Sequence, residues 1–299
     1  MDSGIITILL PIALAVVMAG MGLKLTVQDF ARVSKHPKAV LVALFCQLVL
    51  LVGIAFVICK VLKLPPLLAV GLMLLAASPG GATASLFSYL YKGDIALNIT
   101  LTAINAVIAA FFLPFVVNFA LVYFMDNGQQ LGMQFAKILQ LFVIILIPVA
   151  VGMLIRHYKS SLADKLDRPV RIFALVFLVV IIFAAIFKAR HDLIAYFAQI
   201  GLATALFCAL SLLVGYFVPR MVGINSFQAR ACAFEIGIHN STLAMTIALT
   251  IMANATIAIP AAVYSIFMYV FAVIFGALIT RGDRAQPLTE VATALEKSR

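Results

Sequence analysis

The chain consists of long apolar runs separated by short polar connections. Nine runs have roughly the length of a membrane-spanning helix, which needs about 20 mainly apolar residues. They cover residues 4–23, 39–59, 66–91, 95–123, 138–155, 172–187, 201–218, 230–253 and 257–280. The pattern predicts an all-α, multi-pass membrane protein with nine transmembrane helices in one domain, 1–280, followed by a tail, 281–299.

Composition excludes a water-soluble fold. Only 11% of the residues are charged, whereas a soluble domain has about 25%. The formal net charge of +10 could indicate a nucleic-acid partner, but the basic residues lie between the apolar runs and do not line one face. We therefore expect the lipid bilayer, and no nucleic acid, as the surrounding partner.

The positions of the basic residues predict the orientation in the membrane. Sixteen of the 21 Lys and Arg residues lie in the tail or in the connections after the first, third, fifth and seventh runs, if Arg230 at the first position of the eighth run is included. Cytoplasmic connections carry an excess of Lys and Arg. We therefore expect a plasma (inner) membrane location, with the N-terminus outside and the tail, 281–299, in the cytoplasm.

Two of the predicted spans are interrupted by helix breakers and polar residues. The third contains Ser-Pro-Gly-Gly-Ala-Thr-Ala-Ser at 78–85, and the eighth contains Glu-Ile-Gly-Ile-His-Asn-Ser-Thr at 235–242. The two lie five spans apart and so run in opposite directions, as in an inverted repeat with halves 1–124 and 138–280. Paired interruptions of this kind indicate a transporter's binding site, and we expect them to meet in the protein interior.

Glu235 is the strongest single candidate for function. If its helix begins near Ser226, a suitable N-cap, Glu235 lies about 14 Å along the helix axis, near the bilayer centre. An acid at this depth costs ~2.5–3.5 kcal/mol or more and is by default functional. The structural alternative is an ion pair with Arg230, five residues earlier.

At these residues the sequence resembles the bile acid:sodium symporter family. The stretches that carry the resemblance are 20–25 with 29–30, Gln47, 79–81 with 89–90 and Gly93, and 235–241. The resemblance implies a core domain with two crossing discontinuous helices, the third and the eighth, beside a panel domain. It also implies that this chain is a version shortened from ten helices to nine.

The resemblance further implies two sodium sites. The first would use Ser85, Asn98, Thr102 and Glu235, while Ala84 occupies a ligand position but cannot coordinate. The second would use Gln47, Glu235, the carbonyls of Ile236 and Ile238, and His239. His239 stands where the family has a glutamine, and imidazole suits transition metals better than a hard cation.

Two half-helices, starting near Ala82 and near Asn240, should point their N-termini at the middle of the membrane. Their uncapped N–H groups and positive dipole ends would bind a substrate carboxylate through Ala82, Thr83, Asn240 and Ser241. The predicted function is therefore sodium-coupled symport of a small organic anion by alternating access. Bile acids, pantoate and keto acids all fit, a monomer is compatible with the sequence, and no cofactor other than sodium is expected.

Three alternatives stay open. A titratable His239 favours a proton-coupled or uncoupled anion carrier. A buried Glu and His also suit an intramembrane hydrolase or transferase, although no metal-binding or Ser/His/Asp set lies at a plausible depth; we do not expect an enzyme. A receptor is the third alternative, but the tail after residue 280 is only 19 residues long.

Overall fold

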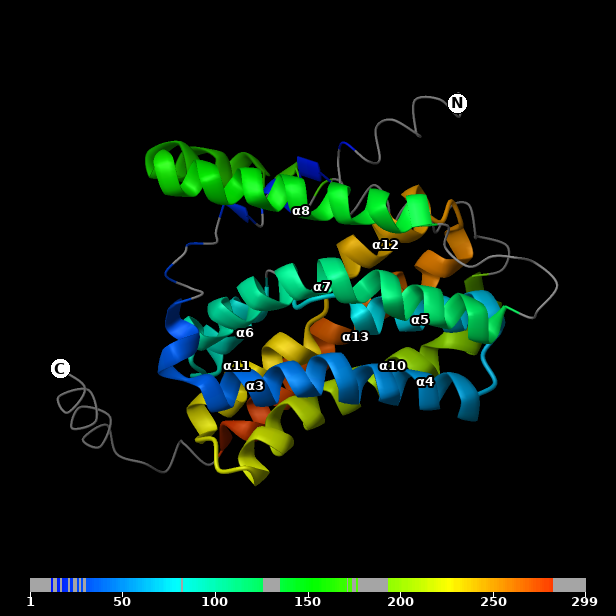
Figure 1. Cartoon of the computed structure of the whole chain (residues 1–299). Helices are drawn as coiled ribbons and strands as arrows, with labels where there is room; N and C mark the ends of the chain where they lie inside the picture. Colours follow the sequence, from blue (N-terminus) through cyan, green and yellow to red (C-terminus); the bar gives the residue numbers. More distant parts are fainter. Residues whose placement is uncertain are drawn as a thin grey trace.

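The computed structural model is almost entirely helical (Figure 1). It describes residues 31–81, 83–125, 135–170 and 193–281, with scattered positions from 12 to 28 and from 172 to 176. The predicted spans 4–23 and 172–187 and the tail therefore fall mostly outside the described residues. The motif residues at 29–30 lie outside them as well.

The described helices follow the predicted apolar runs closely. A 3-10 turn, η1 (Arg32–Lys35), comes before the first of them. The helices are α3 (Pro37–Phe45), η2 (Cys46–Leu50), α4 (Leu51–Val61), α5 (Pro66–Ala77), α6 (Ala84–Leu90), α7 (Ile95–Phe124), α8 (Phe135–Tyr158), α10 (Leu193–Met221), α11 (Ser226–Gly237), α12 (Ser241–Thr250) and α13 (Ala255–Ile279). Among the residues that the structure describes, four stretches are long and apolar enough to cross a membrane: Pro37–Val61, Ile95–Phe124, Gln199–Met221 and Ala255–Ile279. Together with shorter apolar helices, these spans are the architecture of a helical membrane protein.

Asp and Asn side chains set where several helices begin. Asp94 caps α7 by accepting a hydrogen bond from the Leu97 amide, and Asn254 caps α13. The N-cap of α11 is Asn225, which accepts from the Gln228 amide at 2.8 Å. The prediction that Ser226 is the cap was wrong by one residue, because Asn225 has the extended backbone that an N-cap needs and Ser226 is already helical.

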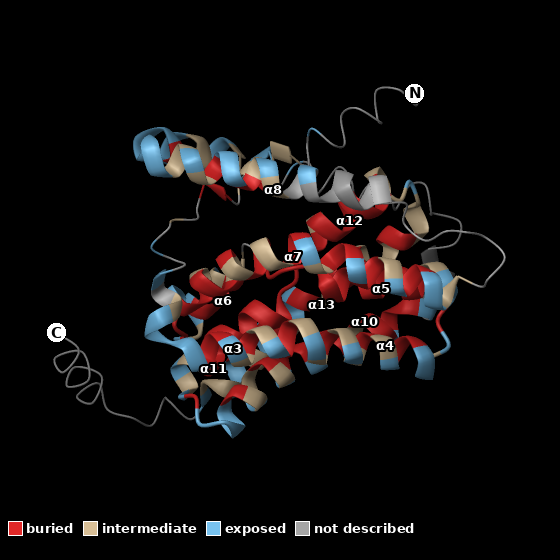
Figure 2. Cartoon of the chain, viewed as in Figure 1, coloured by how far each residue is buried: buried red, intermediate tan, exposed pale blue. Residues whose placement is uncertain are grey.

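Most of the helices surround one interior, and α8 lies to one side of them (Figure 1). α5 and α11 are buried along nearly their whole length, whereas the outward faces of α3, α4 and α8 are exposed (Figure 2). Large apolar side chains such as Phe115 and Val270 are more than half exposed. Faces of this kind suit lipid and not water.

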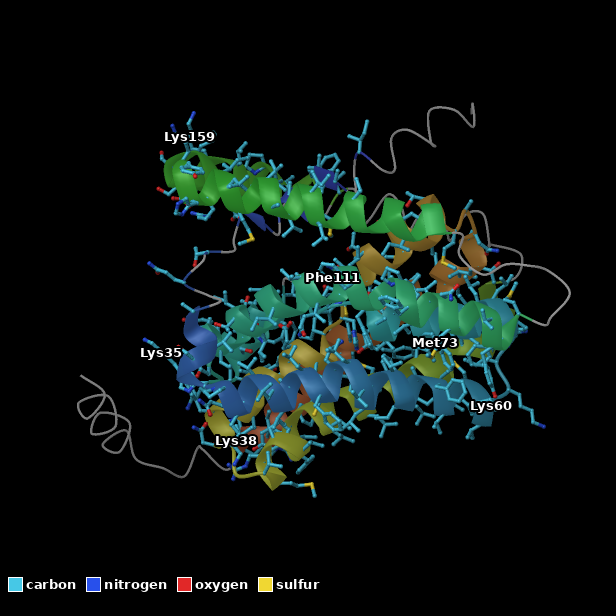
Figure 3. All side chains as sticks on the ribbon, in the orientation of Figure 1. Lys35, Lys38, Lys60, Met73, Phe111 and Lys159 are labelled. Carbon is cyan, nitrogen blue, oxygen red and sulfur yellow. The ribbon has the colours of Figure 1, made fainter. Side chains whose placement is uncertain are left out.

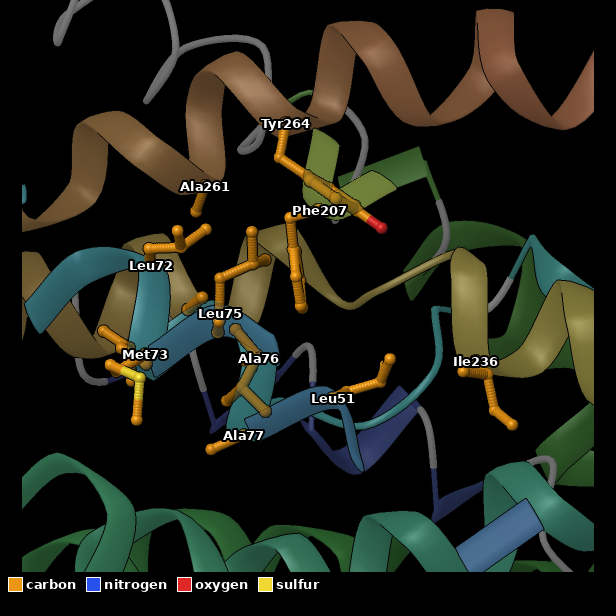
Figure 4. Close-up of a cluster of buried hydrophobic side chains, with 14 of the residues drawn as sticks. Leu51, Leu72, Met73, Leu75, Ala76, Ala77, Phe207, Ile236, Ala261 and Tyr264 are labelled. Atoms are coloured by element: carbon orange, nitrogen blue, oxygen red, sulfur yellow. The ribbon is translucent and has the colours of Figure 1, made fainter. Parts of the chain in front are cut away.

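The interior is filled by side chains from several helices. Figure 4 shows Leu72 and Leu75 of α5 near Phe207 of α10 and Tyr264 of α13, and all four are buried. The ring of Phe207 lies 5.8 Å from that of Tyr264. This packed interior encloses the interrupted segments and positions the polar groups described below.

The connections rich in basic residues share one end of the molecule. Lys35, Lys38 and Lys159 lie at this end, and Lys60 lies at the other (Figure 3). Short contacts join the same connections: His36 with Gln228 at 3.0 Å, and the Asp94 amide with the Phe227 carbonyl at 3.0 Å. Basic connections that are far apart in the sequence therefore lie together at one end of the fold.

One boundary differs clearly from the expected pattern. α10 begins at Leu193, eight residues before the predicted run at 201. The residues from 193 to 200 are mostly apolar, and Gln199 is the one strongly polar side chain among them. A single glutamine is compatible with helical backbone, so the predicted run was started too late.

Candidate functional site

Two short linkers between helices meet in the middle of the molecule. α5 ends at Ala77 and α6 begins at Ala84, while α11 ends at Gly237 and α12 begins at Ser241. Gly80 and His239 pair as an antiparallel bridge. The Gly81 amide donates to the Ile238 carbonyl at 2.6 Å, and the Asn240 amide donates to the Pro79 carbonyl at 2.9 Å. The linkers thus satisfy each other's backbone groups, as non-helical backbone at membrane depth must be satisfied.

Glu235 is completely buried beside these linkers. The Thr102 hydroxyl donates to Oε2 at 2.6 Å, and the Asn105 amide nitrogen donates to Oε1 at 3.2 Å. On another side the carboxylate touches Gly80. Glu235 thus joins α7, α11 and the α5–α6 linker.

Arg230 bonds elsewhere. Its guanidinium donates to the Lys92 carbonyl at 3.2 Å and to the Ile279 carbonyl at 3.4 Å. These carbonyls lie at the C-terminal ends of α6 and α13, where a cation is favourable. The geometry favours a capping role for Arg230 over an ion pair with Glu235.

Gln47 and His239 share the carbonyl oxygen of Ser78. Gln47 Nε2 donates to it at 3.1 Å, and His239 Nδ1 lies 3.3 Å from it. Because a carbonyl only accepts, Nδ1 carries the proton in this bond. Gln47 belongs to the π-helical turn η2, a local widening that is frequent at functional sites.

The His239 ring is held by two aromatic neighbours. Phe207 stacks on it at 5.4 Å, and Tyr264 meets it edge-on at 5.4 Å. The Tyr264 hydroxyl donates to the Gly237 carbonyl at 2.8 Å. The imidazole therefore has a fixed orientation at the α11–α12 linker.

Several buried polar atoms at this junction lack a hydrogen-bond partner among the residues that the structure describes. Three are amide oxygens: Gln47 Oε1, Asn98 Oδ1 and Asn105 Oδ1. The fourth is His239 Nε2. An unsatisfied buried acceptor costs about 1–3 kcal/mol, and uncharged oxygens around a carboxylate are what a hard cation prefers. The amide oxygens and the carboxylate at this junction are thus of the ligand types that sodium prefers.

The predicted sodium residues fall into two groups. Thr102 contacts Glu235, and Gln47 meets His239 at Ser78. Asn98 donates instead to the Ala231 carbonyl at 3.0 Å, one turn before Glu235. Ser85 lies half-buried in the first turn of α6, next to the buried Ala84.

The main-chain positions are at the α11–α12 junction. The Ile238 carbonyl already accepts the Gly81 amide; as a carbonyl it keeps a second lone pair. Ile236 lies in the last turn of α11 with its side chain fully buried. Ile238 thus belongs to the linker that carries His239, and Ile236 lies just before this linker.

The predicted substrate residues differ in their surroundings. Ala82 lies outside the described residues. Thr83 precedes α6, which begins at Ala84, two residues after Ala82. Ser241 is buried, with its hydroxyl 3.9 Å from the Met268 sulfur of α13.

The expectation of an uncapped α12 was wrong. Asn240 is half-buried, and its side chain accepts from the Leu243 amide at 3.0 Å. Asn is among the strongest N-cap residues, so the residue expected to bind substrate also closes the helix end.

Asn105 was missed by the sequence reasoning. Asn98, Thr102 and Asn105 follow at spacings of four and three, which places them on one face of α7. This row of polar residues in an apolar helix is the signal that could have identified it.

Comparisons with known proteins show which family the chain resembles. The model of the "Sodium Bile acid symporter family" matches residues 11–196. The chain is 27% identical to the probable sodium/metabolite cotransporter BASS1, chloroplastic, of Arabidopsis thaliana over 85% of this chain and 62% of that protein. It is 30% identical to the P3 protein of Mus musculus over 82% of this chain and 51% of that protein. It is also 24% identical to the human ileal sodium/bile acid cotransporter over 91% and 79% of the two chains.

The chain therefore spans only half to three fifths of the length of the plant and mouse relatives. The family match covers well over half of this chain and contains the first of the two linkers. The chain belongs to the sodium bile acid symporter family.

Proposed function

We propose that the chain is a secondary transporter that carries a small organic anion together with sodium. The observation that carries the proposal is the fully buried Glu235 carboxylate at the meeting point of two helix linkers. In the described part of the chain, the buried amide oxygens of Gln47, Asn98 and Asn105 have no hydrogen-bond partner, and the Asn105 amide bonds to Glu235. The names of relatives, a sodium/metabolite and a sodium/bile acid cotransporter, support sodium as the coupling ion.

Sodium would offset the cost of a buried charge. A bare carboxylate in the membrane interior is costly, and a bound cation would stabilise it and the junction it contacts. Because Glu235 touches the α5–α6 linker at Gly80, a cation would stabilise the paired linkers in one arrangement. Substrate that prefers this arrangement would then bind more tightly with sodium, and the coupling is reciprocal.

The substrate would bind at the linkers. α12 points its N-terminus, capped by Asn240, at the junction, and the positive end of a helix dipole favours a carboxylate. Thr83 and Asn240 are half-buried there and would contact the substrate, with Ala82 and Ser241 beside them. Bile acids, pantoate and keto acids all have the required carboxylate.

Alternating access would come from relative movement of two groups of helices. The end of α6 lies beside the start of α11, since Asp94 bonds to Phe227, so α5–α6 and α11–α12 run in opposite directions. This supports a nine-helix inverted repeat in which these pairs are the discontinuous helices of a core domain. α8, which lies to one side (Figure 1), would belong to the panel domain.

The orientation in the membrane follows from the basic end. Lys35, Lys38 and Lys159 would face the cytoplasm, with the N-terminus outside and the tail inside. A plasma (inner) membrane location completes the proposal.

A second candidate is a carrier that is coupled to protons or uncoupled. It is favoured by His239, whose imidazole stands where the resemblance expects an oxygen ligand. Accumulation of substrate without sodium would select this candidate.

The proposal is tested by thermal unfolding of the purified protein. Small carboxylates are screened in sodium chloride and in potassium chloride of equal ionic strength. We expect at least one carboxylate to raise the melting temperature in sodium and much less in potassium. Equal stabilisation by all carboxylates in both salts, with no effect of sodium alone, would contradict sodium coupling.

A further inference from the structure

We infer that Asn105 of α7 is a cation ligand of this site and supplies an oxygen that Ala84 cannot. The inference rests on the proposed function and refines the set of ligands. It concerns a residue that the family resemblance did not assign.

The first argument is the position of the Asn105 amide. The residue is 2% exposed, and Nδ2 donates to Glu235 Oε1 at 3.2 Å. Since Nδ2 and Oδ1 belong to one planar amide, this bond holds Oδ1 near the carboxylate. A cation bound there would contact a full negative charge and an amide oxygen together.

The second argument is the unused acceptor. Oδ1 of Asn105 is buried and has no hydrogen-bond partner within the described ranges. A residue that only orients Glu235 needs a donor, and the additional buried oxygen would be a net cost of about 1–3 kcal/mol. A bound cation uses this oxygen and removes the cost.

Thr102 extends the same site. Its hydroxyl donates to Glu235 Oε2 at 2.6 Å, which leaves lone pairs of the hydroxyl oxygen available to a cation. Thr102 lies three residues before Asn105, so both side chains project from one face of α7. One helix thus offers two neutral oxygens to the same carboxylate.

The geometry also separates Asn105 from Asn98. The two lie seven residues apart, or about 10 Å along the helix axis. Asn98 bonds to the Ala231 carbonyl, whereas Asn105 bonds to Glu235 itself. The centre of the site therefore lies further along α7 than the predicted ligand Asn98.

The experiment measures the sodium and lithium concentrations that give half-maximal thermal stabilisation of the purified protein. Asn105→Ala is compared with wild type and with Asn118→Ala, which changes a half-buried asparagine of α7 thirteen residues further on. We expect Asn105→Ala to raise the sodium concentration for half-maximal stabilisation by at least about 10–100-fold, the loss that is typical when even an outer partner of a metal ligand is removed. The Asn118 variant should respond as wild type.

Lithium separates a ligand from a residue that only positions Glu235. Selectivity between cations depends on ligand number and cavity size, so loss of a ligand should change the sodium-to-lithium ratio. Loss of positioning alone would weaken both ions equally, and that result would overturn the inference. If Asn105→Ala does not fold, the same measurements are made on Asn105→Leu. Leucine has the branched shape of the amide but no oxygen, so the same outcomes support or overturn the inference.

The result also distinguishes the two proposals. An unchanged sodium response in Asn105→Ala, with a response in wild type, would reject Asn105 as a ligand and leave the proposed function standing. The absence of any sodium response in wild type would reject both.

Discussion

Gly80 of the α5–α6 linker and Glu235 of α11 are in direct contact. A Cβ atom built on Gly80 would overlap both carboxylate oxygens of Glu235. The absence of a side chain at position 80 lets the buried acid reach the backbone of the α5–α6 linker. This contact connects the charge on α11 to the conformation of the α5–α6 linker.

Replacing Gly80 by alanine should therefore lower the stability and the sodium response together. Gly80 is not among the described residues with positive φ, so the penalty is steric. We expect a cost of about 1–3 kcal/mol, as for other overpacked positions, measured as a lower melting temperature. The matched control is Gly53→Ala, since nothing lies within 4 Å of a Cβ at that position. A Gly80→Ala protein that melts and responds to sodium as Gly53→Ala does would contradict this role of the contact.

His239→Gln should preserve or strengthen the sodium response. Glutamine can donate to the Ser78 carbonyl as His239 Nδ1 does, and it adds an amide oxygen, the ligand type that a hard cation prefers. The measurement is sodium-dependent uptake in proteoliposomes, with the melting temperature as a check of folding. Loss of uptake in a folded variant would show that His239 has a role in coupling or substrate contact that glutamine cannot replace.

Asn240 has two roles that can be separated by substitution. Asn240→Ala removes the N-cap of α12 and should cost about 1 kcal/mol, because Leu243 loses its side-chain partner. Asn240→Ser keeps a capping oxygen and should restore the melting temperature. If Asn240 also contacts substrate, the serine variant should still show weaker substrate-dependent stabilisation. Wild-type substrate affinity in both variants would limit Asn240 to capping.

The orientation can be tested by labelling with a membrane-impermeant thiol reagent. Cys46, Cys59, Cys208 and Cys232 are all buried, so the natural background should be low. A cysteine placed just after Arg281 should react only from the cytoplasmic side, and one placed at position 2 only from outside. Labelling of both positions from the same side would contradict the nine-helix proposal.

Apolar length and helix breakers allowed much of the fold to be predicted from the sequence. The runs at 39–59, 95–123 and 257–280 are close to Pro37–Val61, Ile95–Phe124 and Ala255–Ile279. These helices are apolar almost throughout, so the ends of the apolar run in the sequence coincide with the ends of the helix. The start of α10 was predicted too late because the predicted run was ended at Gln199, although the mostly apolar residues before it are helical as well.

The candidate site was only partly predictable, because the sequence does not show which polar side chains point at Glu235. Glu235 is costly in the membrane, so the sequence identified it without the structure. Asn98 and Asn105 have the same chemistry in the same helix, and only packing against α11 places Asn105 next to the carboxylate. The π-helical turn at Gln47 depends on neighbouring helices, and no residue of that turn indicates it.

The central claim, that Glu235 binds the coupling cation, is tested most directly by Glu235→Gln. Glutamine keeps the size and hydrogen-bonding capacity but removes the charge, so the protein should fold and its melting temperature without sodium should be equal or higher. Sodium-dependent stabilisation should be lost, and substrate affinity measured in sodium should fall by about 5–150-fold, the range typical of coupling between two sites. A Glu235→Gln protein whose sodium-dependent stabilisation and substrate affinity both equal those of wild type would contradict the account.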